Sequence, residues 1–534
     1  MEYTIRTTAG TVPHKKHWQF CVGSGHALLA LRTDYTRQLK FIHDELGIER
    51  VRFHGIFNDD MSTYNTLRVM LPFPGTEQFK EINFRACGVA YDNVLAAGMK
   101  PFVELSFMPR ELASNKDQGD FIYYKPNVCM PKDWDAWEDY LQRFIRFLEH
   151  RYGAEEVRTW YFEVWNEPDL GSTFFSGGDE GYFALYRHSV EAIKSVDPEI
   201  RVGGPATSGS KWIKRFREVC EERGYPLDFL STHQYAGDPI AGVEDNSTPE
   251  DDAGETQSAF SPEKLAAIKQ MLDACPDKTF LGGMRVLLKD KSETEKIKEG
   301  IFRKNAAIVR QQSKDYPVFY TEWGANAIFS AASNDTRKTA AYMVKTALEI
   351  ADDVDGSSVW CFSDLFEEWH PFVEPFHGGF GLLNQDGIPK PGFWGLKLLS
   401  LCGSERLNLG DEAMQGEIGV AAFKSERAMQ VLLFRQRMKN DDAAPKETAS
   451  IHLELSKEPR RVTVMRVDAD HGNPLRVWHE ECGGRNDLNA AEIVLIAGKS
   501  RVEPEKWPYQ YKNDLLTCET ALGVNDVYLF QIEL

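Results

Sequence analysis

Two glutamates, each at the end of a short apolar run, are the residues most suited to acid/base or nucleophilic chemistry. Glu167 lies in FEVWNEPD (162–169), directly after Asn166, and Glu322 lies in FYTEWG (319–324). Runs rich in aromatic and β-branched residues predict β-strands. Hydrolysis of a glycosidic bond needs two carboxyl groups, one to protonate the leaving oxygen and one to act at the anomeric carbon. A single strand-end carboxylate often only pairs with an arginine, but two of them on different strands predict such a pair.

The place of each glutamate on its strand follows from side-chain alternation. Glu163, Trp165 and Glu167 are two residues apart, so we expect them on one face of a strand over 158–165 and its end. Pro168 lacks a backbone donor, which predicts that the strand ends there. Glu167 is therefore expected at the carboxyl end of its strand, and Glu322 at the same position of another. Glu163 lies deeper and is expected to be structural.

The elements that position these glutamates alternate between strands and helices from residue 16 to 402. Amphipathic stretches separate the strands; in one of them Trp137, Leu141, Phe144 and Leu148 share a helical face. Such alternation is typical of parallel strands, and eight units predict an α/β fold, the (β/α)8 TIM barrel, whose active sites lie at the carboxyl ends of the strands. The eight predicted strands are 17–23, 48–57, 100–107, 158–165, 201–206, 228–235, 317–323 and 357–363.

The chain changes character near residue 405. Ile451, Leu453 and Leu455 alternate with polar residues, as do Val462 and Val464. Period-two patterning predicts a C-terminal antiparallel β-sandwich over 405–534. The strand-like residues 1–15 are expected to join it. Residues 244–256 carry acidic groups and no basic one, which indicates a solvated loop that could rim the active site.

The composition and charge of the chain limit the kinds of partner that it can bind. The formal net charge of −19 argues against nucleic acid, because phosphate binding relies on clustered Lys and Arg. No run reaches the roughly 20 apolar residues that span a membrane, and the N-terminal residues lack the apolar segment of a signal peptide. Nine cysteines without a CxxC pair indicate reduced thiols and a cytoplasmic protein. We expect a small glycoside or oligosaccharide as substrate, with no cofactor and no metal; homo-oligomer formation is left open.

As a set, the motifs resemble glycoside hydrolase family 39. The resemblance covers residues 17–402 and is weaker in 240–315 and in the β-rich tail. The family contains retaining (β/α)8 enzymes, among them β-xylosidases and α-L-iduronidases. The resemblance therefore implies a retaining, exo-acting glycoside hydrolase that acts by double displacement, with β-xylosidase as the first choice. The runs that carry it are CVGSGHALLALR (21–32), RFHGIFNDD (52–60), EVWNEPD (163–169), FLSTHQY (229–235), YTEWG (320–324), FEEW (366–369) and PFHGGFGLLNQDGIPKP (375–391).

The resemblance also implies roles at matching positions. Glu167 corresponds to the general acid/base and Glu322 to the nucleophile. Asn166 corresponds to the residue that hydrogen-bonds the sugar 2-hydroxyl. Tyr235 corresponds to the residue whose hydroxyl orients the nucleophile.

The remaining matched positions would line the sugar site. His54 and His233 fall at positions next to the sugar. Trp360 could stack on it, and one of Glu367 and Glu368 could hold its distal hydroxyls. The run after Glu368 differs from the family's pattern, so the far end of the pocket is expected to be particular to this chain.

Alternatives come from three classes. An α-L-iduronidase must hold a substrate carboxylate, and no Arg or Lys at a predicted strand end clearly supplies the cation; activity on arabinose or glucose units stays open. A metal-dependent hydrolase could use His54, Asp59, Asp60 and His233, but no HExxH-like spacing supports it. A non-catalytic sugar-binding protein on the same scaffold would not need both carboxylates and the asparagine, all of which are present.

Overall fold

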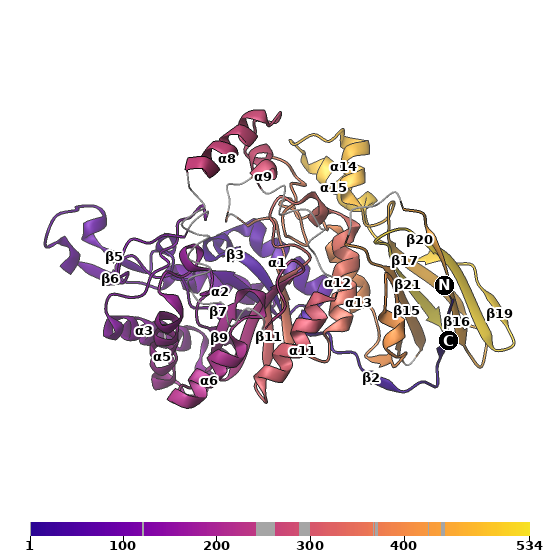
Figure 1. Ribbon diagram of the computed structural model, residues 1–534, viewed down its shortest axis with the longest axis horizontal. Coiled ribbons are helices and arrows are strands. Elements are labelled where there is room, and N and C mark those ends of the chain that lie inside the picture. The colour runs from indigo at the N-terminus through magenta and orange to yellow at the C-terminus, as the bar shows by residue number, and fades with distance from the viewer. Residues whose placement is uncertain are drawn as a thin grey trace.

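The computed structural model describes residues 2–119, 122–241, 262–287, 300–366, 368, 372–425, 427–438 and 444–534. Its larger part is a closed barrel of parallel strands (Figure 1), which confirms the predicted TIM barrel. The predicted acidic loop 244–256 lies outside the described residues. The strands, in order around the barrel, are β3 (Cys21–His26), β4 (Arg50–His54), β7 (Lys100–Glu104), β8 (Tyr161–Glu163), β9 (Arg201–Thr207), β10 (Phe229–Tyr235), β11 (Val318–Gly324) and β12 (Gly356–Val359).

Helices cover the outside of the barrel and bury apolar residues against it. In α3 the predicted face is buried, Asp133 caps the first turn by accepting a hydrogen bond from the Ala136 N–H at 3.0 Å, and Gly153 ends the helix. Between β10 and β11 the chain also forms α8 (Pro262–Ala274) and α9 (Phe280–Leu287). The helices that follow the eight strands are α1 (Thr33–Leu46), α2 (Arg85–Ala96), α3 (Trp134–Tyr152), α5 (Gly178–Val196), α6 (Ile213–Arg223), α11 (Ile301–Ser313), α12 (Arg337–Glu349) and α13 (Pro391–Ser400).

The barrel interior is layered. Near the amino ends of the strands, aromatic rings fill the space, among them Phe102, Phe229 and Phe319. Toward the carboxyl ends, charged residues take their place: Arg52 and Glu163 are fully buried. Buried charges are costly unless each has a partner of opposite charge. We therefore expect the charged residues at the carboxyl ends of the strands to contact one another.

The predicted end of the fourth strand is wrong. β8 stops at Glu163, and Trp165 and Glu167 have positive φ angles of 73° and 40°. A strand cannot continue through such residues, which lie outside the β region. The loop is instead tied to β9, because the Glu167 N–H donates to the Ala206 carbonyl at 2.9 Å. Glu167 therefore lies on a loop above the barrel and not on the strand itself.

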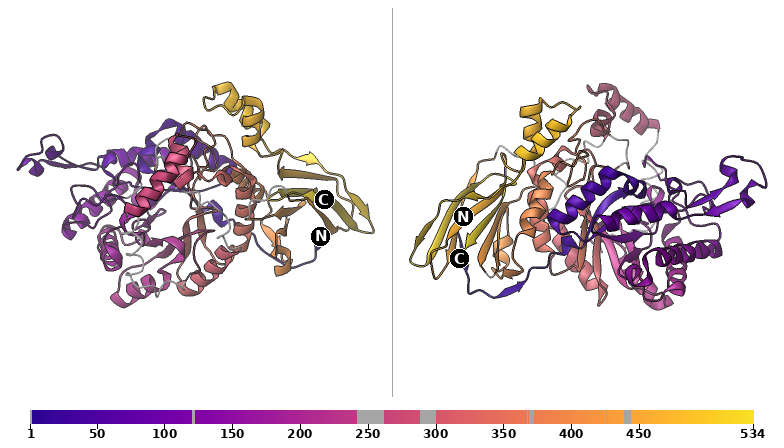
Figure 2. Two further views of the ribbon diagram at one scale, coloured as in Figure 1. Left: turned by 45° about the horizontal axis from the view of Figure 1, so that its top comes forward. Right: turned by 180° about the vertical axis from the view of Figure 1, so that it is seen from behind.

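The C-terminal residues form two facing sheets around a separate apolar core, as predicted (Figures 1 and 2). Ile451, Leu453 and Leu455 point into this core. β1 pairs with β16 in parallel and β2 pairs with β13, so the N-terminal residues belong to these sheets. The strands, in sheet order, are β1 (Glu2–Arg6), β16 (Glu447–Glu454), β20 (Leu515–Leu522) and β19 (Gln510–Lys512), then β18 (Glu505–Lys506), β17 (Arg461–Val467), β21 (Val527–Glu533), β15 (Ala428–Arg435), β14 (Ile418–Lys424), β13 (Glu405–Leu407) and β2 (Thr11–Pro13).

Two helices interrupt this region, α14 (Pro474–Cys482) and α15 (Ala490–Lys499). These helices were not predicted, although Asn489 and Glu492 form a capping box that is readable in the sequence. Figure 2 shows the pair projecting from the sheets. Trp478 of α14 lies against Phe376 of the loop after β12, with ring centroids 5.6 Å apart.

A hairpin of β5 (Tyr64–Thr66) and β6 (Lys80–Ile82) projects from the barrel (Figure 1). No helix in the described part of the chain is long and apolar enough to cross a membrane. All nine cysteines are buried and free.

Candidate active site

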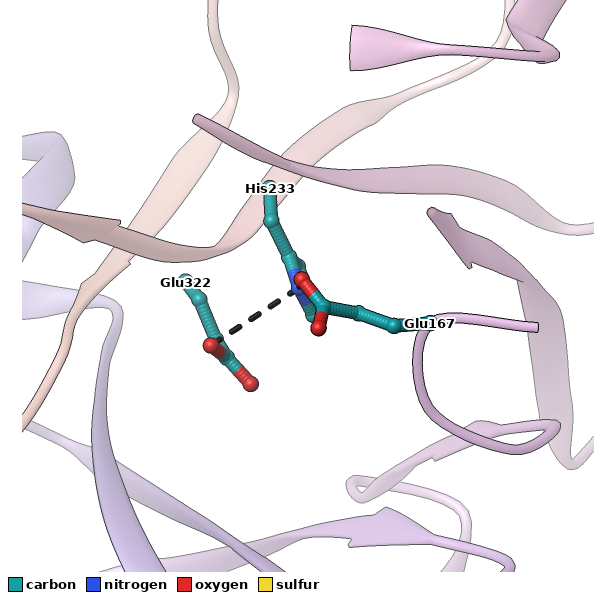
Figure 3. A group of neighbouring side chains, drawn as sticks. All are labelled: Glu167, His233 and Glu322. Carbon is teal, nitrogen blue, oxygen red and sulfur yellow. Dashed lines mark hydrogen bonds and ion pairs between the residues drawn. The ribbon is translucent and has the colours of Figure 1, made fainter. Parts of the chain in front are cut away.

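Glu167 and Glu322 converge at the mouth of the barrel (Figure 3). A carboxylate oxygen of each and one ring nitrogen of His233 all lie within 4.8 Å of one another. His233 Nδ1 is 2.9 Å from Glu167 Oε1 and 3.7 Å from Glu322 Oε2. Both glutamates are largely buried, at 8% and 4% exposure. The two carboxyl groups share one poorly solvated space.

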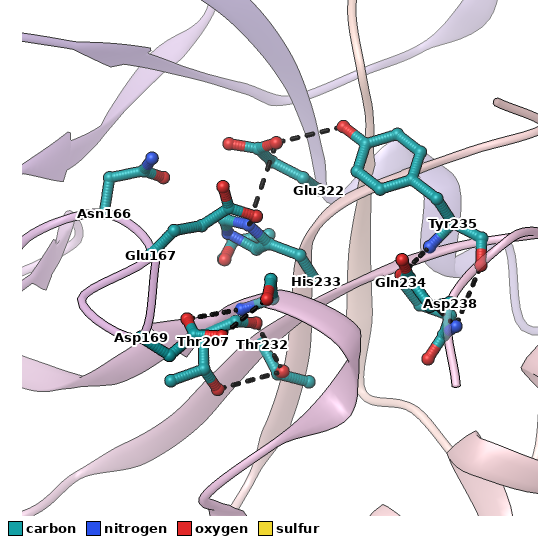
Figure 4. Close-up of polar contacts among 12 residues, drawn as sticks. Asn166, Glu167, Asp169, Thr207, Thr232, His233, Gln234, Tyr235, Asp238 and Glu322 are labelled. Carbon is teal, nitrogen blue, oxygen red and sulfur yellow. Dashed lines mark hydrogen bonds and ion pairs between the residues drawn. The ribbon is translucent and has the colours of Figure 1, made fainter. Parts of the chain in front are cut away.

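Glu322 has donors on both oxygens. Arg52 Nη1 donates to Oε1 at 2.9 Å. The Tyr235 hydroxyl donates to Oε2 at 3.0 Å, as Figure 4 shows. Burial raises the pKa of Glu322 above its usual value, and the Arg52 guanidinium opposes part of that rise. Donors on both oxygens favour the ionised form.

Glu167 has fewer donors: among the described residues, the side chain in hydrogen-bond contact with it is His233. Burial, together with the negative charge of Asp169, raises the pKa of Glu167 to about 8. Asp169 is fixed by the Ser208 N–H at 2.9 Å and by Lys211 Nζ at 3.4 Å. Burial lowers the pKa of His233, so the ring next to Glu167 is neutral and adds no positive charge. Glu167 therefore keeps a proton near neutral pH.

Arg52 joins several side chains of the site by hydrogen bonds and was not predicted from the sequence. It is fully buried on β4. Its Nε donates to Glu163 at 2.6 Å, and its Nη2 donates to Asn166 Oδ1 at 2.8 Å. The expectation that no strand-end Arg or Lys supplies a cation does not cover it, because Arg52 lies two residues before the end of β4. The signal was available, because an arginine inside an apolar strand must meet carboxylates there.

His54 ends β4 and contacts two carboxylates. Its Nδ1 lies 2.6 Å from Glu104 Oε2 and its Nε2 lies 3.3 Å from Glu368 Oε1. Burial lowers the pKa of His54, but Glu104 and Glu368 outweigh burial and raise it to about 10. Glu163 and Glu104 both support the site by binding its cations, Glu163 through Arg52 and Glu104 through His54. A structural role was predicted for Glu163, whereas none was predicted for Glu104.

Trp360 forms one wall of the site. Its ring centroid lies 4.8 Å from that of His54. Gly23 makes room for it, since a Cβ there would lie 2.4 Å from the indole Cε3. Glu367 lies outside the described residues. The predicted residues that the structure brings together are His54, Asn166, Glu167, His233, Tyr235, Glu322, Trp360 and Glu368.

The metal ligands considered from the sequence do not form a group. Asp60 contacts His26 at 3.0 Å, and Asp59 contacts Arg110 at 3.0 Å. Among the described residues, the one cluster with metal-ligand spacing is Glu167, His233 and Glu322. Arg52 already supplies the positive charge beside that cluster, and a metal ion would have to bind against it.

The fold and the site together define a glycoside hydrolase: an eight-stranded parallel barrel brings two buried glutamates to its mouth, among aromatic and hydrogen-bonding side chains. Comparison with known proteins identifies the family of glycoside hydrolases. The chain belongs to glycosyl hydrolases family 39, whose sequence model matches residues 3–281 and 278–496. The resemblance seen in the motifs is confirmed.

The relatives match along nearly the whole chain. A β-xylosidase of Caldicellulosiruptor saccharolyticus is 36% identical over 505 residues, 94% of this chain and 92% of the relative. A β-xylosidase of Geobacillus stearothermophilus is 31% identical over 98% of this chain and 94% of its own length. The solved structure of a family 39 β-xylosidase from Caulobacter crescentus has a TM-score of 0.73 at 26% identity and covers 100% of both chains.

Proposed function

We propose that this protein is a retaining, exo-acting β-xylosidase, with Glu167 as general acid/base and Glu322 as nucleophile. The observation that carries the proposal is the pair itself. One oxygen of each buried carboxyl group lies within 4.8 Å of one oxygen of the other, and among the described residues a charged and a hydroxyl donor reach Glu322 but not Glu167. The pair therefore contains one carboxylate that can attack and one carboxyl that can give a proton.

In the first step Glu322 attacks the anomeric carbon and forms a glycosyl ester. The bond between that carbon and the leaving oxygen breaks, and Glu167 gives its proton to this oxygen. The Tyr235 hydroxyl, 3.0 Å from Oε2, orients the attacking carboxylate. Each residue is already placed before substrate binds, which lowers the entropic cost of the step.

In the second step Glu167 acts as a base. Esterification removes the negative charge of Glu322, so the proton affinity of Glu167 falls. Glu167 then takes a proton from water, the water oxygen bonds to the anomeric carbon, and Glu322 is released. The sugar leaves with the configuration it had in the substrate.

Asn166 is proposed to bind the sugar 2-hydroxyl. Its Oδ1 accepts from Arg52 at 2.8 Å, which fixes the orientation of the amide. Its Nδ2 is buried and has no hydrogen-bond partner within the described part of the chain. A buried donor without a partner costs about 1–3 kcal/mol, which a substrate hydroxyl would offset.

A neutral pentose fits the charges of the site. Glu322 and Glu368 both face His54, and each guanidinium nitrogen of Arg52 already has a protein acceptor. A substrate carboxylate would meet these glutamates, which disfavours an iduronidase. The relatives that match almost the whole chain are named β-xylosidases. Free, buried cysteines support the cytoplasmic location expected from the sequence.

The test is a series of p-nitrophenyl glycosides that differ only in the sugar: β-D-xyloside, β-D-glucoside, α-L-arabinofuranoside and α-L-iduronide. We expect the β-xyloside to have the highest kcat/KM, by roughly 10- to 100-fold over the glucoside, because one extra group in a fitted pocket costs about 1–3 kcal/mol. Preference for another sugar would contradict the xylosidase assignment alone. Binding without turnover of any glycoside would indicate a sugar-binding protein.

A further inference from the structure

Glu104, the last residue of β7, joins two buried cations. Its Oε2 lies 2.9 Å from Arg52 Nη2 and 2.6 Å from His54 Nδ1. Its Oε1 accepts from the Ser106 hydroxyl, which in turn accepts from the Gly55 N–H at 3.0 Å. Every contact fixes the carboxylate in one orientation between the cations.

Arg52 and His54 also lie near the same oxygen atom of Glu322. Arg52 Nη1 lies 2.9 Å from Glu322 Oε1, and His54 Nε2 lies 3.7 Å from the same oxygen. His54 has a carboxylate at each ring nitrogen, since Glu368 lies 3.3 Å from Nε2. A neutral ring would turn a lone pair toward one of these carboxylates, so the geometry favours the doubly protonated imidazolium.

Arg52 and His54 are two residues apart on β4 and therefore point to the same side of the strand. Two positive charges side by side in a buried space repel each other and favour loss of the histidine proton. The carboxylate of Glu104 lies between them and offsets that repulsion. Burial raises the pKa of Glu104, but His54 and Arg52 outweigh it and hold the pKa below its usual value.

We propose that Glu104 is a positioning residue: it holds Arg52 and the His54 imidazolium against Glu322 Oε1, so that Glu322 is ionised while Glu167 keeps its proton. The proposal rests on the roles proposed above for Glu322 and Glu167. It gives a reason for a fully buried carboxylate that does not itself reach the bond being cleaved. The charged groups that face His54 are Arg52 on β4, Glu104 on β7, Glu322 on β11, Glu167 in the loop after β8 and Glu368 after β12.

Glu163 provides a matched control. It is the in-register neighbour of Glu104 on β8 and is equally buried. It also binds Arg52, at 2.6 Å, and accepts from the Thr321 hydroxyl at 2.8 Å. None of its contacts with described residues is with His54. Comparison of Glu104→Gln with Glu163→Gln therefore separates the effect on His54 from the loss of any buried carboxylate beside Arg52.

The experiment combines two measurements on the full chain. The first is the titration of histidine side chains by NMR with ¹⁵N-histidine, with His54 assigned from the His54→Asn spectrum. The second is kcat/KM for p-nitrophenyl β-xyloside against pH. In the Glu104→Gln protein we expect His54 to lose its second proton at lower pH than in the wild type. We expect the acidic limit of kcat/KM to move to higher pH by about one unit, because Glu322 loses cationic support.

For Glu163→Gln we expect weaker activity but an unchanged titration of His54. The proposal is overturned if Glu104→Gln alters neither the His54 titration nor the acidic limit, or if Glu163→Gln alters both equally. Wild-type His54 that titrates near the ordinary histidine value would also overturn it, even if the variants fail to fold. The NMR result does not depend on turnover, so absence of glycosidase activity would contradict the proposed function and leave this part of the test intact.

Discussion

A carboxylate oxygen of Glu167 lies within 4.8 Å of one of Glu322, although the residues come from opposite parts of the barrel sequence. Retaining glycosidases place their carboxyl groups about 5–5.5 Å apart, whereas inverting enzymes need roughly 6.5–9.5 Å to admit a water. We therefore expect retention. A ¹H NMR time course on p-nitrophenyl β-xyloside should show the β-anomer of xylose first, with the α-anomer arising only by mutarotation. Initial release of the α-anomer would contradict the prediction.

Glu322→Ala should remove the nucleophile. We expect normal folding, checked by circular dichroism, with a loss of several orders of magnitude in kcat, because attack at the anomeric carbon is lost. Added azide should restore part of the activity and yield the α-glycosyl azide, since a small anion attacks from the vacated face. Near wild-type turnover, or azide rescue with the β product, would rule out the assignment.

Glu167→Ala should remove the acid. Activity falls as pH rises through the pKa of Glu167, which burial and then Asp169 raise to about 8, so the wild type should lose kcat/KM on the alkaline side as this proton dissociates. The variant should lack this basic limit. It should also slow substrates with poor leaving groups far more than activated aryl xylosides, which need little protonation. Equal losses for both substrate types, with the basic limit kept, would exclude Glu167 as acid.

Glu167→Gln should stabilise the fold. With the folded pKa at about 8 and the unfolded value near 4.5, unfolding releases a proton between these pH values, and wild-type stability falls as pH rises through this window. The neutral amide avoids this loss. We expect the free energy of unfolding at pH 8 to exceed that of the wild type by on the order of 1–3 kcal/mol. The difference should vanish below about pH 4.5; denaturant titrations that show no pH-dependent difference would contradict it.

Gly23→Ala should displace Trp360. The added Cβ would lie 2.4 Å from the indole and 3.2 Å from the Val359 carbonyl oxygen, and overpacking of this kind costs about 1–3 kcal/mol. We expect lower kcat/KM and a lower Tm. Gly10→Ala is the control, because a Cβ there meets nothing within 4 Å. Equal kinetics for the two variants would mean that the position of Trp360 does not matter for turnover.

The sequence was sufficient for most of the barrel. Strands such as β10, predicted at 228–235 and found at Phe229–Tyr235, are buried on both faces, so their apolar runs are continuous and end at polar residues. The end of β8 was not predictable in this way. Alternation places Glu167 on the strand, but the positive φ angles of Trp165 and Glu167 arise from contacts of the loop with β9.

By itself, the sequence determined the fold class, the family and the pair of glutamates, because each depends on local patterns and on spacing along the chain. Only the tertiary structure decided that Arg52 joins Glu163, Glu322 and Asn166, and that Glu104 lies between Arg52 and His54. It also decided that burial and Asp169 raise the pKa of Glu167. Burial and the distances between charged groups set the pKa of a carboxyl group. These distances are between side chains on different strands, so the residue pattern of a single strand does not reveal them.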